Sequence, residues 1–186
     1  MLIFKWFKKL LKVYMEKGIQ TDDILNFNET GYQVGVGGDQ DIVTFYLKRR
    51  HTLPNDTNHE HITFTEIISA GGWSIPPVII ISGIILLKRY FQDLLDGYLV
   101  AVSDSGYTND EILYEIIKHI NKFTKPRSKG PYRLLLLDNH ECHLSLQFLE
   151  YCEENDIILF RLPAHTTHFL QPLDVSYFQA NKHYHR

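Results

Sequence analysis

Two short segments in the last third of the sequence combine carboxylates with imidazoles, side chains that bind metals and transfer protons. The first is a run of leucines that ends at Asp138 and is followed by His140. The second contains His165 and His168 and ends at Asp174. Carboxylate oxygens are the ligands that hard divalent cations such as Mg²⁺ prefer. A single aspartate after a buried strand is more often a structural cap or loop residue, so neither segment defines a site alone.

Together, the two segments resemble the DDE superfamily endonuclease domain of pogo, Tigger and jerky-like transposases and of centromere-protein-B-like proteins. In that family one carboxylate closes a leucine-rich strand. Another follows a Pro-Ala-His-Thr-Thr-His segment and ends a Gln-Pro-Leu-Asp segment. Asp138 and Asp174 occupy these second and third positions, and the 35 residues between them are the interval typical of such enzymes. Shorter matches at residues 26–32, 69–77 and 103–109 extend the resemblance over nearly the whole chain.

The resemblance also implies a reaction and its cofactors. Three carboxylates in this family hold two Mg²⁺ or Mn²⁺ ions, which serve DNA phosphodiester cleavage and strand transfer. Asp138 and Asp174 are therefore the expected metal ligands and catalytic residues, whereas Asn28 stands where the family places its first catalytic aspartate. A neutral amide offers one carbonyl oxygen, so we expect weakened metal binding and an impaired nuclease. Glu29 cannot replace the missing carboxylate, because adjacent side chains on a strand point to opposite faces.

DNA is the partner that the resemblance implies, both as the transposon ends and as the target. The resemblance also implies a nuclear location, and it is compatible with an oligomeric enzyme. Candidate phosphate contacts come from the motif histidines and from a basic loop, namely His140, His165, His168, Arg49 and Arg50. The His-x-x-His spacing of the motif histidines also allows a structural zinc ion, a weaker interpretation. Two alternatives stay open at this point: a non-enzymatic DNA-binding protein derived from a transposase, and a related enzyme that acts on RNA.

The apolar pattern predicts the elements that must position these side chains. Three antiparallel strands at the start of a sheet are predicted among the extended runs at residues 23–34, 41–47, 61–70 and 77–81. Two central parallel strands are predicted by unbroken apolar runs at residues 132–138 and 157–162. Helices are expected at residues 1–17, 87–95, 109–123 and 144–155 and from residue 173. The order predicts an α/β fold with a ribonuclease-H-like mixed five-stranded sheet flanked by helices.

Length and composition fit one domain, because 186 residues can bury a single sizeable core. We expect a basic amphipathic helix at residues 1–20 as the run-in to a C-terminally truncated catalytic core at residues 21–186. The helix-turn-helix modules that the family places ahead of this core are not expected in the chain. A net charge of −3 gives no argument for nucleic acid binding, so a basic surface must be local. No apolar run reaches the roughly 20 residues that cross a bilayer, so no membrane partner is expected.

Overall fold

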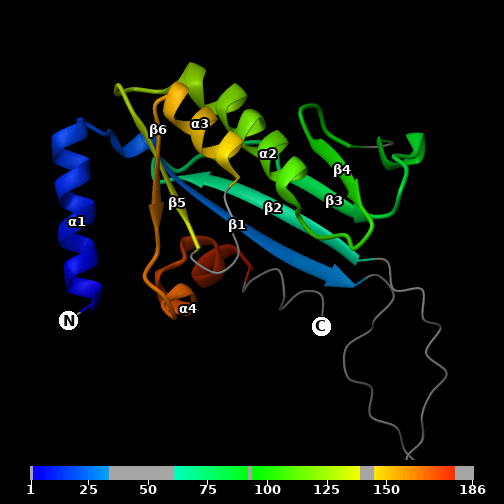
Figure 1. Ribbon diagram of the computed structural model, residues 1–186, viewed down its shortest axis with the longest axis horizontal. Coiled ribbons are helices and arrows are strands. Elements are labelled where there is room, and N and C mark those ends of the chain that lie inside the picture. Colours follow the sequence, from blue (N-terminus) through cyan, green and yellow to red (C-terminus); the bar gives the residue numbers. More distant parts are fainter. Residues whose placement is uncertain (1, 34–60, 92–93, 139–144, 179–186) are drawn as a thin grey trace, which may run out of the picture.

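The computed structural model describes residues 2–33, 61–91, 94–138 and 145–178. The predicted strand at 41–47 lies outside these ranges. A mixed six-stranded sheet has the order β4-β3-β2-β1-β5-β6 (Figure 1). Its strands are β1 (Ile24–Gln33), β2 (His61–Ser69), β3 (Val78–Ser82), β4 (Leu99–Ser103), β5 (Arg133–Leu137) and β6 (Ile157–Arg161). The antiparallel pairs are β1 with β2 and β2 with β3, whereas β1 with β5, β5 with β6 and β3 with β4 are parallel.

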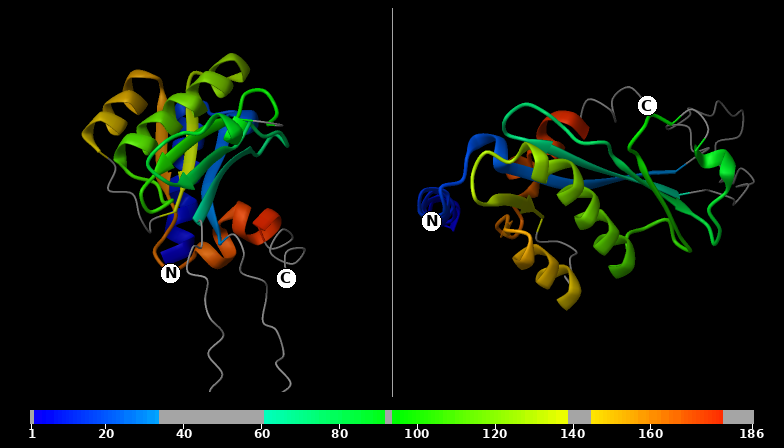
Figure 2. Two further views of the ribbon diagram at one scale, coloured as in Figure 1. Left: turned by 90° about the vertical axis from the view of Figure 1, so that its right-hand side faces the viewer. Right: turned by 90° about the horizontal axis from the view of Figure 1, so that it is seen from above.

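Alternation along β1 assigns its side chains to the two faces of the sheet. Leu25 and Phe27 are buried in the main core, which the helices α2 (Asp110–Thr124) and α3 (Leu146–Glu154) cover. Successive side chains on a strand point to opposite faces, so Asn26 points away from these helices. Figure 2 shows α2 and α3 on one face and the red-orange C-terminal segment on the other.

The helix α2 combines a polar N-cap with an apolar stripe. The side-chain oxygen of Asn109 accepts a hydrogen bond of 2.8 Å from the backbone N–H of Ile112, which confirms the predicted cap. Ile116 and Ile117 are fully buried against the sheet. Truncating such a buried isoleucine to alanine typically costs about 2–5 kcal/mol, so α2 is a main source of the stability of the core.

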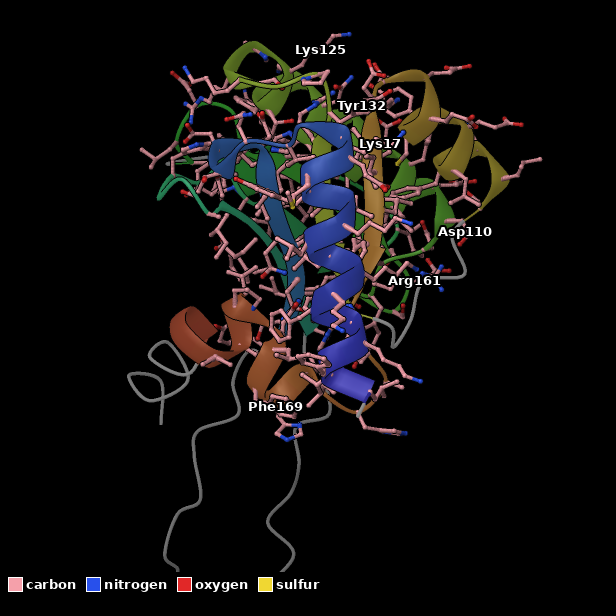
Figure 3. All side chains as sticks on the ribbon, turned by 90° about the vertical axis from the view of Figure 1, so that its left-hand side faces the viewer. Lys17, Asp110, Lys125, Tyr132, Arg161 and Phe169 are labelled. Atoms are coloured by element: carbon pink, nitrogen blue, oxygen red, sulfur yellow. The ribbon has the colours of Figure 1, made fainter. Side chains whose placement is uncertain are left out.

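The N-terminal helix α1 (Leu2–Lys17) covers the opposite face of the sheet at β5 and β6. Its side chains, among them Trp6, pack on Leu134, Leu136 and Phe160. The indole N–H of Trp6 donates a hydrogen bond of 2.7 Å to the backbone oxygen of Arg161. Figure 3 shows α1 along β6, with Lys17 near Tyr132, whose ring centroid lies 4.9 Å from the Lys17 ammonium. Among the helices that the structure describes, none has the length and apolar character needed to span a membrane.

Two sequence-based predictions of the fold need correction. The sheet has six strands rather than five, because Leu99–Ser103 forms a short edge strand parallel to β3. In this edge strand Val100 alone is buried, so the segment lacks the doubly buried character that marks a central strand. The helix expected at 87–95 is reduced to a 3₁₀ turn at Lys88–Phe91, and residues 92–93 lie outside the described part.

Candidate active site

The register of β1 and β5 brings position 28 beside position 138. The parallel ladder pairs Ile24 with Leu134 and Asn26 with Leu136. The paired positions end there, and the same register continued by two residues brings Asn28 level with Asp138, the residue that follows β5. Neighbouring strands lie about 5 Å apart, and in-register residues face the same side of the sheet. The sheet itself therefore places the amide of Asn28 next to the carboxylate of Asp138.

Asp138 is held at the end of β5 by a hydroxyl of the second motif. The Oγ1 atom of Thr167 lies 3.2 Å and 3.3 Å from the two carboxylate oxygens and donates to this carboxylate. Thr167 begins the short helix α4 (Thr167–Leu170), and the preceding Thr166 is buried and donates to the backbone oxygen of Pro163 at 2.7 Å. Thr167 thus ties the start of α4 to the end of β5, whereas Thr166 closes a turn within the segment ahead of α4. Figure 1 shows α4 near the end of β5.

The segment that carries Asp174 is docked on β1 by a buried network of amide side chains. The Nδ2 group of Asn26 donates to the side-chain oxygen of Gln171 at 3.0 Å and to the backbone oxygen of Leu136 at 3.2 Å. Asn26 in turn accepts a hydrogen bond of 3.2 Å from the backbone N–H of Leu173.

Gln171 completes this network by donating to the backbone oxygen of Phe27 at 3.0 Å. Asn26 is 3% exposed and Gln171 0%, so both amides are fully withdrawn from water. Buried amide groups need hydrogen-bond partners. Here the partners join β1 to the segment that carries Asp174. Asp174 is half-buried at the start of the π-helical segment η4 (Leu173–Phe178), on the face of β1 to which Asn26 points.

The two residues at positions 28 and 29 point to opposite faces, as the sequence predicts. The hydroxyl of Thr108, just ahead of α2, donates to the carboxylate of Glu29 at 2.7 Å. This bond places Glu29 on the α2 face, whereas Asn28 shares its face with Asn26 and η4. Glu29 therefore does not lie beside Asp138.

The remaining predicted site residues separate into two groups. Arg49, Arg50 and His140 lie outside the described residues. His165 and His168 flank the start of α4 and are exposed, and His165 adopts a left-handed backbone with φ of 61°. Within residues 2–33, 61–91, 94–138 and 145–178, no three His, Cys, Asp or Glu side chains gather closely enough to hold a metal ion by themselves.

A family model described as DDE superfamily endonuclease matches residues 59–186. The chain belongs to this family. The matched part of this DDE endonuclease chain includes Asp138 and Asp174 and begins after Asn28.

Solved structures of Mos1 transposase share the fold of this DDE endonuclease chain. The catalytic domain of Mos1 mariner transposase matches over 95% of the chain and 66% of its own length, with 13% identity and a TM-score of 0.53. The Mos1 mariner paired end complex with Mn matches over 95% of the chain and 46% of its own length, with 14% identity and a TM-score of 0.59. These likenesses confirm the predicted ribonuclease-H-like fold of a transposase catalytic core.

A curated relative of this DDE endonuclease chain carries a different kind of name. The MFS-type transporter clz9 of Cochliobolus lunatus is 35% identical over 179 residues, which are 95% of this chain and 20% of that protein. The chain thus spans about a fifth of the length of this relative.

The side chains at the site suit a hard divalent cation. Asp138 and Asp174 offer carboxylate oxygens, and Asn28 offers one amide oxygen. Mg²⁺ and Mn²⁺ take such oxygen ligands, whereas zinc prefers nitrogen and sulfur. Sequence reasoning missed the amides of Asn26 and Gln171 and the hydroxyl of Thr167. For Asn26 and Gln171 the signal was a polar residue between apolar neighbours, whereas Thr167 lies in a polar run and carried no such signal.

Proposed function

We propose that this chain is the catalytic core of a DNA transposase whose nuclease activity is weakened at one position. Asp138 and Asp174 would hold Mg²⁺ or Mn²⁺, with Asn28 in the place of the first carboxylate. The observation that supports the proposal is the β1–β5 register, which, continued by two residues, brings Asn28 level with Asp138 in a member of the DDE endonuclease family. When bound, two such ions would activate the attacking oxygen and stabilise the leaving oxygen of a phosphodiester.

The chain's own groups would orient this site. Thr167 donates to Asp138 and so fixes the direction of its carboxylate, while Asn26 and Gln171 hold the segment that begins at Leu173. Groups that orient metal ligands in this way typically change metal affinity by about 10- to 100-fold when removed. Asn28 brings no negative charge, and one end of its amide is a hydrogen-bond donor that repels a cation.

DNA is the proposed substrate, and a nucleus the proposed location. Mos1 transposase, which shares the fold, has been solved in a paired-end complex with its left transposon end; that structure covers 95% of this chain with 16% identity and a TM-score of 0.56. The exposed His165 and His168, in the segment whose Thr167 donates to Asp138, are candidates for phosphate contacts, as are His140, Arg49 and Arg50.

The experiment is a nicking assay on supercoiled plasmid DNA with Mn²⁺ or Mg²⁺. We expect the unmodified chain to nick slowly and Asn28→Asp to nick faster, because the substitution restores a third carboxylate. Asp138→Ala in the Asn28→Asp background should abolish the gain. Equal rates for all three proteins would contradict the proposal.

A second candidate function is DNA binding without cleavage, and Asn28 is the observation that favours it. In that case DNA affinity should be indifferent to Mg²⁺ and to Asp138→Asn, and Asn28→Asp should produce no nicking. Fluorescence anisotropy with labelled duplex DNA separates the two candidates, because a metal-dependent core should bind more tightly when the cation is present.

A further inference from the structure

Glu66 is the residue of β2 that lies directly opposite Asn28. The antiparallel register pairs Asn28 with Glu66, and also Phe27 with Ile67 and Glu29 with Thr65. Directly opposite residues of an antiparallel pair project from the same face, with their Cβ atoms about 5 Å apart. Ile67, the next residue along β2, is fully buried in the core under α2. Glu66 therefore points to the other face, which it shares with Asn28.

The register sets three polar side chains in one row across three strands. Glu66 on β2, Asn28 on β1 and Asp138 at the end of β5 follow one another on the same face, about 5 Å apart at each step. Glutamate is one methylene longer than aspartate, so its carboxylate reaches further toward the centre of the row. The row thus has a carboxylate at each end and a neutral amide between them.

The environment of Glu66 is unfavourable for a carboxylate that stands alone. The side chain is half-buried, and this burial raises the pKa of the Glu66 carboxyl above its ordinary value of 4.5. Among the residues that the structure describes, none donates a hydrogen bond to Glu66 or forms an ion pair with it. A charged group that is withdrawn from water needs a partner of opposite charge to offset its desolvation.

The other carboxylates near β1 have partners in the fold. Glu29 accepts the hydroxyl of Thr108 on the opposite face. Asp23, at the far end of β1, accepts the backbone N–H groups of Lys129 and Gly130 at 3.0 Å and 2.6 Å. These contacts assign both residues to structural roles and leave Glu66 as the carboxylate that borders Asn28 on the β2 side, opposite Asp138.

The geometry points to Glu66 as the group that supplies the cation site with the negative charge missing at position 28. This inference rests on the proposed function, since it needs a divalent cation beside Asp138. Asn28 would then contribute its amide oxygen, with Glu66 and Asp138 on either side. A transposase core with this substitution would retain Mn²⁺ or Mg²⁺ binding, weaker than with a bridging aspartate but well above that of two carboxylates alone.

Mn²⁺ binding to the purified chain tests the inference, measured from the electron paramagnetic resonance signal of free Mn²⁺. We expect Glu66→Gln to weaken binding at least tenfold, within the range of about 10- to 100-fold found for groups that support metal ligands. Glu29→Gln is the matched control, because it removes the same charge from the other face and should leave binding unchanged. Adding Asn28→Asp to Glu66→Gln should restore the lost affinity.

Metal-free thermal melting shows whether each variant folds, and Glu66→Gln should not lower the midpoint because it removes an unpaired half-buried charge. If Glu66→Gln binds Mn²⁺ as tightly as Glu29→Gln while Asp138→Asn binds it more weakly, the role of Glu66 is refuted but the cation site at Asp138 is supported. Saturable Mn²⁺ binding by Asn28→Asp but not by the unmodified chain would likewise refute the role of Glu66 and support the cation site. If Asp138→Asn and Asn28→Asp both bind like the unmodified chain, the proposed function itself fails.

Discussion

Replacing Gln171 with alanine should detach the segment that carries Asp174 from β1. The change leaves one N–H of the Asn26 amide and the backbone oxygen of Phe27 without partners in a site where Gln171 is 0% exposed. Each buried polar group without a partner costs about 1–3 kcal/mol. We therefore expect the free energy of unfolding to fall by about 2–6 kcal/mol for the two groups, a large part of the roughly 5–15 kcal/mol that stabilises a domain.

Urea unfolding followed by circular dichroism gives this free energy, and hydrogen exchange of the Leu173 amide reports on docking. That amide donates to Asn26, so it should exchange faster in Gln171→Ala. Asn26→Ala should have a similar effect, and the double variant should reveal a coupling of about 1 kcal/mol, because the two side chains share one hydrogen bond. Asn109→Ala is the control. It removes the N-cap of α2 and should lower the free energy of unfolding by about 1 kcal/mol, but it should leave the Leu173 amide protected from exchange.

A loss below 1 kcal/mol in Gln171→Ala, with the Leu173 amide still protected, would refute the role of this network. The segment would then be held by the fully buried side chain of Leu173 alone.

Three further predictions concern single side chains. Thr167→Val removes the hydroxyl that donates to Asp138, so Mn²⁺ affinity should fall about 10- to 100-fold; Thr167→Ser should keep it, and equal affinities would contradict the orienting role. Burial lowers the pKa of His119 below its ordinary 6.5, while its Nε2–H donates to the backbone oxygen of Pro76. The unfolded chain therefore takes up the proton first, so the His119 contribution to stability should be complete above pH 6.5 and lost as pH falls below it; urea unfolding against pH should show a shallower decline in His119→Gln, and identical profiles would count against this. Burial raises the pKa of Cys152 to about 12, so iodoacetamide should alkylate this thiol only after unfolding, and rapid labelling of native protein would disprove it.

The sequence predicted the elements that have a long apolar pattern or that are buried on both faces of the sheet. Four leucines ahead of Asp138 indicated a central strand, and β5 is buried along its whole length. Asn109 predicted the start of α2 because a polar cap precedes a helical stripe. The edge strand β4 was missed, since Val100 alone among its residues is buried and the strand lacks the fully buried character of β5.

The candidate site could be predicted only in part. Asp138, Asp174 and Asn28 followed from motifs, but the contact between Asn26 and Gln171 joins residues 145 positions apart. The position of Glu66 depends on the register of β2 against β1. A shift of one residue would turn Glu66 to the opposite face, and no local pattern fixes that register.

The central claim is that positions 28 and 138 border one cation site on the sheet. Anomalous diffraction from Mn²⁺-soaked crystals of the Asn28→Asp variant tests it most directly. We predict an anomalous peak between the carboxylates of residues 28 and 138, with Asp174 on the same side of the sheet. Manganese bound elsewhere, or side chains at 28 and 138 that face opposite sides, would contradict the account.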